Sequence, residues 1–274
     1  MAKSETIFMA IGGGEIADAP DILDEIFGYL HDRDDPRMVI MTVATNQEEE
    51  AKKKYDAMFR RKGVRHVETV NISERTHAFD EASVKKVERA HAFFFTGGDQ
   101  QYVTALMGGS PVDLMMKERI KEGILLAGTS AGAAMMSGAM ILGGGGSTAP
   151  RVGGVELGPG MNLIPDTIID THFSQRGRHG RLLTAIAHDP QLLGLGIDER
   201  TAMRLQGKEF RVLGNGCVTA MDGRAVSHTD LVDKGDDKPV GILNVCLHVL
   251  PAGYSFDVET RTPHAPTARA AHQS

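Results

Sequence analysis

Residues 124–137 read ILLAGTSAGAAMMS, and the interpretation of the whole chain depends on this stretch. An apolar run is followed by small residues around Ser130 and then by a second apolar pattern with helical spacing. This order indicates a buried strand that turns abruptly into a helix. A serine at such a turn is either the N-cap of the helix or a nucleophile with its hydroxyl exposed above a sheet. The G-x-S-x-G pattern alone favours neither interpretation.

The chain before this stretch alternates between β-prone and helical patterns. Short apolar runs predict strands at Ile7–Ile11, Met38–Val43, Arg65–Val70, Ala92–Thr96 and Ile124–Ala127. Helical periodicity lies between them, at Asp18–Leu30, Glu48–Lys62, Asp80–Arg89 and Asp99–Gly123, the last interrupted near Gly108–Pro111. Strands that alternate with helices of this length are typical of βαβ units. We therefore predict an α/β fold with a mainly parallel sheet flanked by helices.

The second half of the chain changes character. After a strand at Thr167–Asp170 and a helix at Arg178–His188, the β-like runs are Leu195–Ile197, Thr201–Leu205, Glu209–Leu213, Cys217–Met221, Arg224–His228 and Ile242–Val249. The turns GNG at 214–216 and MDGR at 221–224 predict hairpins. We expect antiparallel strands added to the same sheet. The prediction is a single domain over residues 1–258 and a flexible tail over 259–274, where periodicity is lost.

Composition narrows the function classes. With 274 residues and a net charge of -6, the chain lacks the basic surplus of a general nucleic-acid binder. No apolar run reaches the length of a membrane span, and the N-terminal one is too short for a signal peptide. Cys217 and Cys246 are too few for a disulfide framework. We predict a cytoplasmic protein with no membrane partner, no cofactor and, lacking HExxH or a tight His/Asp cluster, no metal.

Three glycine-containing loops follow predicted strands, at the edge of a parallel sheet where reactive groups collect. They are GGGE at 12–15, TGGDQQ at 96–101 and GTSAGA at 128–133. GGGE is not a complete G-x-G-x-x-G fingerprint, because Ala17 takes the last position and no acidic residue follows the second strand. We therefore exclude a dinucleotide site.

A serine nucleophile needs a base, and the base needs an orienting carboxylate. His172, in DTHFSQRGRHGRL at 170–182, lies at the end of a predicted strand among polar groups. We prefer His172 as the candidate base over His188, His228 and His248, whose positions in the sequence would also allow this role. Further on, GIDERTA at 196–202 offers an acidic pair in a turn between two β-like runs. The chain order Ser–His–acid differs from that of the α/β-hydrolases.

Taken together, TGGDQQ, GTSAGA, DTHFSQRGRHGRL and GIDERTA resemble, in order and separation, the cyanophycinases, serine peptidases related to the aspartyl dipeptidases. The resemblance covers the chain from the first glycine loop to about residue 225. It implies a sheet like that of the class I glutamine amidotransferases and a homodimer. It also implies Ser130 as nucleophile, His172 as base and Glu199 as orienting carboxylate, with Asp198 the adjacent alternative. The oxyanion donors would be the N–H groups of Ala131 and of the Gly97–Gly98 turn.

The resemblance further implies a substrate. Cyanophycin is a poly-aspartate chain with arginine on each side-chain carboxylate, and the family cuts it from chain ends into β-aspartyl-arginine dipeptides. Arg176, Arg178 and Arg181 would bind substrate carboxylates. Asp170 would hold a guanidinium or α-amino group, and Gln100 or Gln101 a carboxyl or amide. The set of expected substrate-binding residues is completed by Asp99, Thr171 and Gln175.

One departure from the family pattern lies beside the predicted base. The family has glutamine between the aspartate and the histidine, whereas this sequence has Thr171. Threonine is shorter and has no amide, so the departure bears on substrate preference rather than on the hydrolytic chemistry. Two alternatives stay open: an α-aspartyl dipeptidase on the same scaffold, and a non-catalytic binding protein that keeps the pocket.

Overall fold

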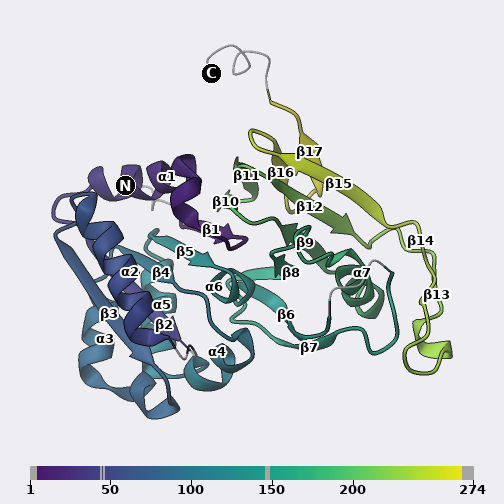
Figure 1. Cartoon of the computed structure of the whole chain (residues 1–274), viewed down its shortest axis with the longest axis horizontal. Helices are drawn as coiled ribbons and strands as arrows, with labels where there is room; N and C mark the ends of the chain where they lie inside the picture. Colours follow the sequence, from purple (N-terminus) through teal and green to yellow (C-terminus); the bar gives the residue numbers. More distant parts are fainter. Residues whose placement is uncertain (1–4, 44, 46, 146–148, 267–274) are drawn as a thin grey trace.

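A computed structural model of the chain describes residues 5–43, 45, 47–145 and 149–266. Within these residues, nine strands form the larger of its sheets (Figure 1). Its parallel half has the spatial order β3 (His66–Ile72), β2 (Arg37–Val43), β4 (Ala92–Phe95), β5 (Leu125–Thr129) and β1 (Ile7–Ile11). Its antiparallel half continues from β1 with β10 (Thr201–Gln206), β11 (Glu209–Gly214), β16 (Ser255–Asp257) and β17 (Thr262–His264). The predicted α/β class with a parallel sheet is confirmed.

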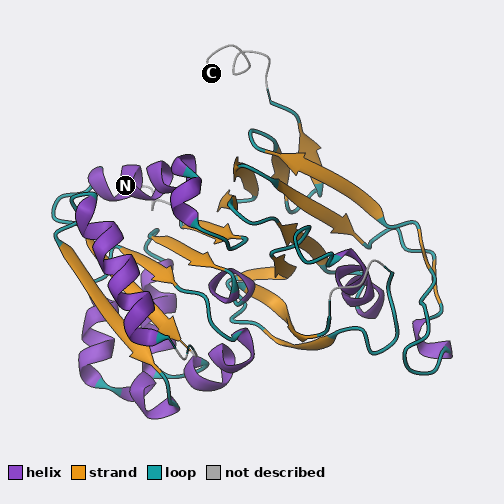
Figure 2. Ribbon diagram, viewed as in Figure 1, coloured by secondary structure: helices purple, strands orange, loops and turns teal. Residues whose placement is uncertain are grey.

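Helices cover both faces of the parallel half (Figure 2). One face packs against α1 (Pro20–His31) and α2 (Glu48–Arg61). The opposite face packs against α3 (Glu81–Glu88), α4 (Gln100–Met107) and α5 (Pro111–Ile120). In β4, Phe94 faces the first group while Phe93 and Phe95 face the second, and all three are buried. The strand is therefore apolar at successive positions because neither face meets water.

A second sheet was not predicted from the sequence. Among the described residues it has six strands in the order β15 (Cys246–Pro251), β12 (Cys217–Asp222), β9 (Leu193–Ile197), β8 (Ile164–Thr171), β6 (Ser137–Gly143) and β7 (Glu156–Pro159). The chain enters this second sheet because of the segment that directly follows Ser130. The helix there, α6 (Ala131–Ala134), has a single turn, so the chain leaves the first sheet and begins β6. The last helix, α7 (His179–His188), packs its apolar side on β8 and β12.

Two other expectations about the C-terminal region are corrected. The predicted strand Arg224–His228 is absent, and only β13 (His228–Thr229) pairs with β14 (Ile242–Leu243). The predicted run Ile242–Val249 is divided, because Asn244 has a positive φ that breaks the extended backbone before β15. Within the range 259–274, where a flexible tail was expected, Thr262–His264 forms the edge strand β17, a position where a proline is tolerated.

The remainder of that expected tail, 267–274, lies outside the described residues. The single domain over 1–258 stays a prediction. Within the described residues, no helix combines the length and the apolar character needed to cross a membrane.

The aromatic packing under β4 provides a test of the core. The Phe94 ring lies 4.6 Å from the Tyr55 ring and 5.5 Å from the Phe59 ring, measured between centroids. Phe94→Ala should lower the free energy of unfolding by about 3–5 kcal/mol, because it leaves a cavity in a close-packed region. Phe79→Ala, at a ring that is 55% exposed, should lower it by less than about 1 kcal/mol. Urea titrations of both variants measure the difference, and equal losses would contradict this packing.

Candidate active site

Ser130 lies directly after β5, between β1 and β4 in the sheet. Its backbone has φ 55° and ψ -116°, a conformation that non-glycine residues rarely adopt. Its N–H donates to the carbonyl of Ile11 at 3.0 Å, which fixes the turn to the neighbouring strand. The side chain makes no cap hydrogen bond to α6. Instead, Ser130 Oγ lies 2.9 Å from His172 Nε2, so the cap interpretation is not supported.

His172 follows β8 immediately and also has a positive φ, 48°. Its N–H donates to the carbonyl of Gly12 at 2.7 Å. On the far side of the ring, Nδ1 lies 2.6 Å from Glu199 Oε1. Glu199 is held in the turn between β9 and β10, where its own N–H donates to Gln175 Oε1 at 3.0 Å. A hydroxyl, an imidazole and a carboxylate are thus linked in one row.

The neighbouring acid, Asp198, points elsewhere. It is buried, and its two carboxylate oxygens accept from the N–H groups of Ser174 at 3.0 Å and Cys217 at 3.1 Å. These bonds join the turn that follows β8 to the start of β12. Of the two acidic candidates, Glu199 is therefore the one in contact with His172.

The glycines of the GGGE loop form the wall of this site. A Cβ on Gly12 would lie 2.1 Å from the carbonyl oxygen of Asp198, and one on Gly13 would lie 2.3 Å from His172 Cε1. Both distances are far below contact, so the backbone approaches as closely as it does only because side chains are absent. Sequence reasoning noted this loop at a strand end but gave it no part in the site. Three successive glycines there were the available signal.

Two backbone segments adjoin Ser130, the start of α6 and the Gly97–Gly98 turn. Ala131 is the first residue of α6, so its N–H has no carbonyl one turn earlier to bond. A Cβ on Gly97 would lie 3.6 Å from that of Ser130, which places the Gly97–Gly98 turn directly against the serine. These are the positions predicted for an oxyanion hole, and their N–H groups are suited to stabilising developing negative charge.

In the TGGDQQ loop, two polar side chains make hydrogen bonds within the protein and a third is exposed to solvent. Asp99 caps α4 by accepting from the N–H of Gln101 at 3.0 Å. Gln100 Nε2 donates to the carbonyl of Ile141 at 2.9 Å, which joins α4 to β6. The Gln101 side chain is exposed.

Some of the expected substrate-binding residues around His172 are buried and some are exposed. Asp170 is 2% exposed and forms ion pairs with both Arg178 and Arg181, so these three residues form one cluster. Thr171 is buried, and its carbonyl accepts from Arg178 Nη1 at 2.6 Å. Arg176 is exposed near His172, and its side chain has no ion pair or hydrogen bond among the described residues.

The electrostatic surroundings favour a neutral imidazole. Burial lowers the pKa of His172 below its ordinary value of 6.5, and the positive charges of Arg176 and Arg178 lower it further. The hydrogen bond and negative charge of Glu199 oppose this effect, so the net direction is downward. A neutral imidazole is the form able to accept a proton from Ser130.

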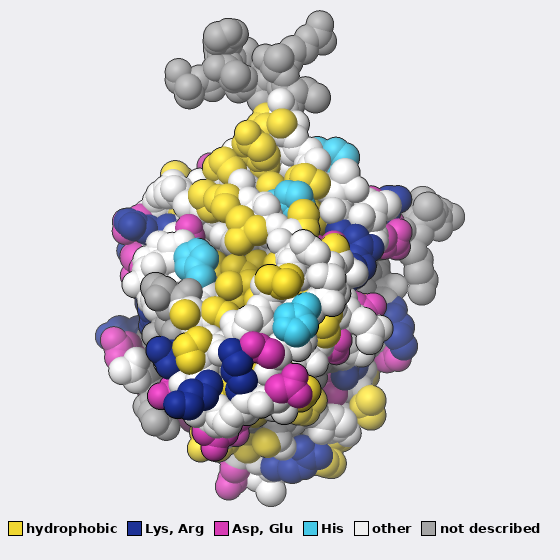
Figure 3. All heavy atoms as spheres, turned by 90° about the vertical axis from the view of Figure 1, so that its right-hand side faces the viewer, with side chains coloured by type: hydrophobic (Ala, Val, Ile, Leu, Met, Phe, Trp, Pro, Cys, Tyr) yellow, Lys and Arg dark blue, Asp and Glu magenta, His cyan; other side chains and the backbone are white. Residues whose placement is uncertain are grey.

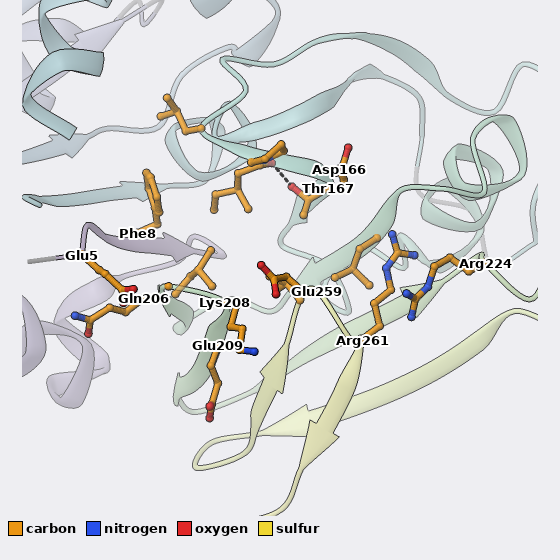
Figure 4. A pocket seen from close by; sticks show the side chains of 17 residues that line it. Glu5, Phe8, Asp166, Thr167, Gln206, Lys208, Glu209, Arg224, Glu259 and Arg261 are labelled. Atoms are coloured by element: carbon orange, nitrogen blue, oxygen red, sulfur yellow. Dashed lines mark hydrogen bonds between the residues drawn. The ribbon is translucent and has the colours of Figure 1, made fainter. Parts of the chain in front are cut away.

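A pocket of about 760 Å³ lies away from this site, at the opposite ends of the strands, where the start of β8 faces the turn between β10 and β11 (Figure 4). Asp166 and Thr167 line it, whereas His172 lies at the other end of the same strand. No metal-ligating group of three or more His, Cys, Asp or Glu side chains occurs within the described part of the chain.

The row of groups at Ser130, on an α/β sheet, is typical of a serine-type hydrolase. The comparison with known families makes the class specific. The model of peptidase family S51 matches residues 8–213, and the chain therefore belongs to this family. It is accordingly an enzyme, a peptidase of the serine type.

Individual relatives agree with this assignment. A cyanophycinase of Geminocystis herdmanii is 36% identical over 214 residues, which cover 77% of this chain and 79% of the relative. A cyanophycinase of a Nostoc species is 34% identical over 262 residues, covering 94% of this chain and 88% of that one. Among solved structures, a peptidase from an acI-B1 actinobacterium has a TM-score of 0.67 at 19% identity, covering 94% and 98% of the two chains. This last similarity shows a shared fold.

The lowered pKa of His172 predicts the acid limb of the pH profile. If His172 is the base, activity falls as pH decreases through its pKa, because the protonated ring accepts no proton. The midpoint of kcat/KM should therefore lie below pH 6.5, the ordinary value for histidine. Arg176→Gln removes a neighbouring positive charge and should move the midpoint upward. A wild-type midpoint above 6.5, or a variant midpoint shifted downward, would contradict this assignment.

Proposed function

We propose that this enzyme is a cyanophycinase, which hydrolyses the poly-aspartate backbone of cyanophycin from a chain end and releases β-aspartyl-arginine dipeptides. The observation that carries the proposal is the row Ser130–His172–Glu199, with its hydrogen-bond distances of 2.9 and 2.6 Å. The names of the relatives at 34–36% identity supply the substrate.

The geometry supports an acyl-enzyme mechanism. His172 removes the proton of Ser130 while Ser130 Oγ attacks the carbonyl carbon of a backbone Asp–Asp bond. The N–H groups of Ala131 and of the Gly97–Gly98 turn stabilise the tetrahedral oxyanion. His172 then gives the proton to the leaving amine, and an ester to Ser130 remains. Water, deprotonated by His172, hydrolyses this ester. Glu199 holds the imidazole orientation and stabilises its charged form in both steps.

The exposed polar groups beside the serine are suited to bind the substrate. Each arginine branch of cyanophycin carries a free carboxylate, and Arg176 presents an exposed guanidinium next to His172. A guanidinium binds a carboxylate through two parallel hydrogen bonds, which favours arginine at such a position. Gln101, also exposed, is suited to donate to or accept from an amide or carboxyl group. Gln175 instead supports Glu199, since its amide oxygen accepts from the Glu199 N–H.

The two alternatives are less well supported. An α-aspartyl dipeptidase is not favoured by the names of the similar proteins, which are cyanophycinases. A binding protein without activity has no need of a serine in a strained turn beside a histidine and a carboxylate.

Product analysis distinguishes these functions. Wild-type protein incubated with cyanophycin should release β-Asp-Arg, detected by mass spectrometry. Ser130→Ala should lower kcat by several orders of magnitude, on the order of the ~10⁶ that follows loss of a serine nucleophile, while the polymer still binds. Cleavage of Asp-X dipeptides alone would contradict the substrate assignment. If neither substrate is hydrolysed, the remaining alternative is a non-catalytic binding protein.

We further propose a cytoplasmic homodimer. Both cysteines are free, which fits a reducing compartment. Strand β15 is an edge of the six-stranded sheet and has no charged residue, and Leu247 and Val249 on it are 49% and 55% exposed. Hydrophobic side chains gather on this face of the molecule (Figure 3). An uncharged apolar edge is a ready surface for pairing with an identical strand.

A charge on this edge should separate the subunits. Leu247→Lys should convert a dimer to a monomer in light scattering, since two like charges would face each other across a two-fold axis. Leu114→Lys, at a leucine on α5 that is 58% exposed, is the control and should remain dimeric. A monomeric wild-type protein would contradict the proposal.

A further inference from the structure

We infer that Asp198 and Thr201, on either side of Glu199 along the chain, are positioning residues that hold the Glu199 carboxylate against His172. The inference rests on the proposed function, because it takes Glu199 as the orienting acid of the proposed base. The Glu199 side chain is 30% exposed, and within the described residues its carboxylate has one hydrogen-bond partner, His172 Nδ1. The position of this carboxylate therefore depends on the backbone that carries it.

Asp198 holds the backbone on the N-terminal side of Glu199. One oxygen of its buried carboxylate accepts from the N–H of Ser174 at 3.0 Å, and the other accepts from the N–H of Cys217 at 3.1 Å. Ser174 is the second residue after His172, so this carboxylate joins the segment of the base to the segment of the acid. A buried charge requires such partners, and here both are backbone groups whose places it fixes.

Thr201 holds the backbone on the other side of Glu199. It is fully buried, and its Oγ1 donates to the carbonyl of Glu199 at 3.2 Å. The same oxygen accepts from the N–H of Gly216 at 2.9 Å. A Cβ on Gly216 would lie 2.7 Å from Thr201 Oγ1 and 2.8 Å from Asp198 Cβ, so this close approach requires glycine. Thr201 and Asp198 thus bind the same short segment before β12.

Residues 215–217 bind the turn of Glu199 through three successive N–H groups. The N–H of Asn215 donates to the carbonyl of Arg200 at 2.9 Å, and the next two donate to the Thr201 and Asp198 side chains. Arg200 has a φ of 55°, a conformation that persists where surrounding contacts impose it. Loss of either side-chain acceptor would release this turn and with it Glu199.

A positioning role and a purely structural role predict different pH profiles. Burial lowers the pKa of His172, and the charges of Arg176 and Arg178 lower it further. The hydrogen bond and negative charge of Glu199 raise it. If Glu199 moves away from the ring, the pKa of His172 falls, and the acid midpoint of kcat/KM moves to lower pH. A change that only loosens the fold lowers the melting temperature and leaves the midpoint of the folded protein in place.

Thr167 provides the matched control. It is also a buried threonine of a strand, and its Oγ1 donates to the carbonyl of Ile164 at 2.7 Å (Figure 4). It lines the pocket at the end of β8 away from His172. Thr167→Val therefore removes a buried hydroxyl with one backbone bond, away from the serine, and should leave kcat and the midpoint unchanged.

The decisive experiment measures the pH profile of cyanophycin hydrolysis by folded Thr201→Val. This variant keeps the branched shape of the side chain, changes no charge and removes the hydroxyl. It should lower kcat by about ten-fold, since misplacement of a reacting group by about 1 Å can cost up to about 10²-fold, and the acid midpoint of kcat/KM should move to lower pH. Thr201→Ser keeps the hydroxyl and should recover most of both. A Thr201→Val midpoint at the wild-type value would overturn the inference, whatever the change in kcat.

Asp198→Asn provides a second variant if Thr201→Val does not fold. An amide NH₂ replaces one acceptor oxygen and would face a backbone N–H, so one of the two bonds is lost. Because this change also removes a charge, its measurement is the rate at which a small uncharged fluorophosphonate labels Ser130, a reaction that requires an activated serine. The rate should fall below that of wild type, and an unchanged rate would overturn the inference. Wild-type protein that is labelled no faster than Ser130→Ala would instead overturn the proposed function itself.

Discussion

The close approach of backbone at Gly12 and Gly13 is the constraint on which the rest of the site depends. Ser130 belongs to the nine-stranded sheet, whereas His172 follows a strand of the other sheet and Glu199 leaves that sheet from β9. The carbonyl of Gly12 accepts from His172, and that of Gly13 accepts from the N–H of Arg200 at 2.8 Å. The two sheets therefore meet through the first strand's glycine loop. A side chain at either glycine would overlap the groups that the loop brings together.

Positive φ values at Ser130, His172 and Arg200 have a common origin in this arrangement. Ser130 and His172 lie where the chain leaves a strand, and Arg200 lies in the turn that leads from β9 into β10. Backbone strain of this kind costs on the order of 1–3 kcal/mol per residue and is retained where the surrounding structure imposes it. Here the hydrogen bonds from Ser130 to Ile11, His172 to Gly12 and Arg200 to Gly13 impose it. Orientation of the reacting groups is thus built into the ground state of the fold.

The sequence was sufficient for the groups of the site and for half of the fold. Continuous apolar runs such as AFFF predict strands covered on both faces, and β4 is such a strand. Ser130 and His172 were each found at a predicted strand end, and the family resemblance selected Glu199 over Asp198 in the turn further on. The structure brings Ser130, His172 and Glu199 into contact. The second sheet could not be predicted, because AAMMS has helical spacing yet forms only one turn of helix. Its later residues enter β6, and tertiary packing rather than local propensity decides that outcome.

The arginines after His172 show a different limit of sequence reasoning. Three arginines in RGRHGR indicate an anionic ligand by type and spacing, but composition does not reveal which of them already has a partner. Arg181 lies on α7 and Arg178 is its N-cap residue, and both pair with Asp170, whereas Arg176 lies two residues earlier and is exposed. The partner of the buried pair, Asp170, is supplied by the strand that carries the histidine.

The central claim is that Ser130 and His172 act as one unit across the two sheets. The most direct measurement is kcat on cyanophycin for Ser130→Ala, His172→Ala and the double variant, with folding verified in each. Groups that act as a unit are strongly non-additive, so the double variant should retain about the same residual activity as either single one. Losses that multiply in the double variant would contradict the claim, because they would show two groups acting independently.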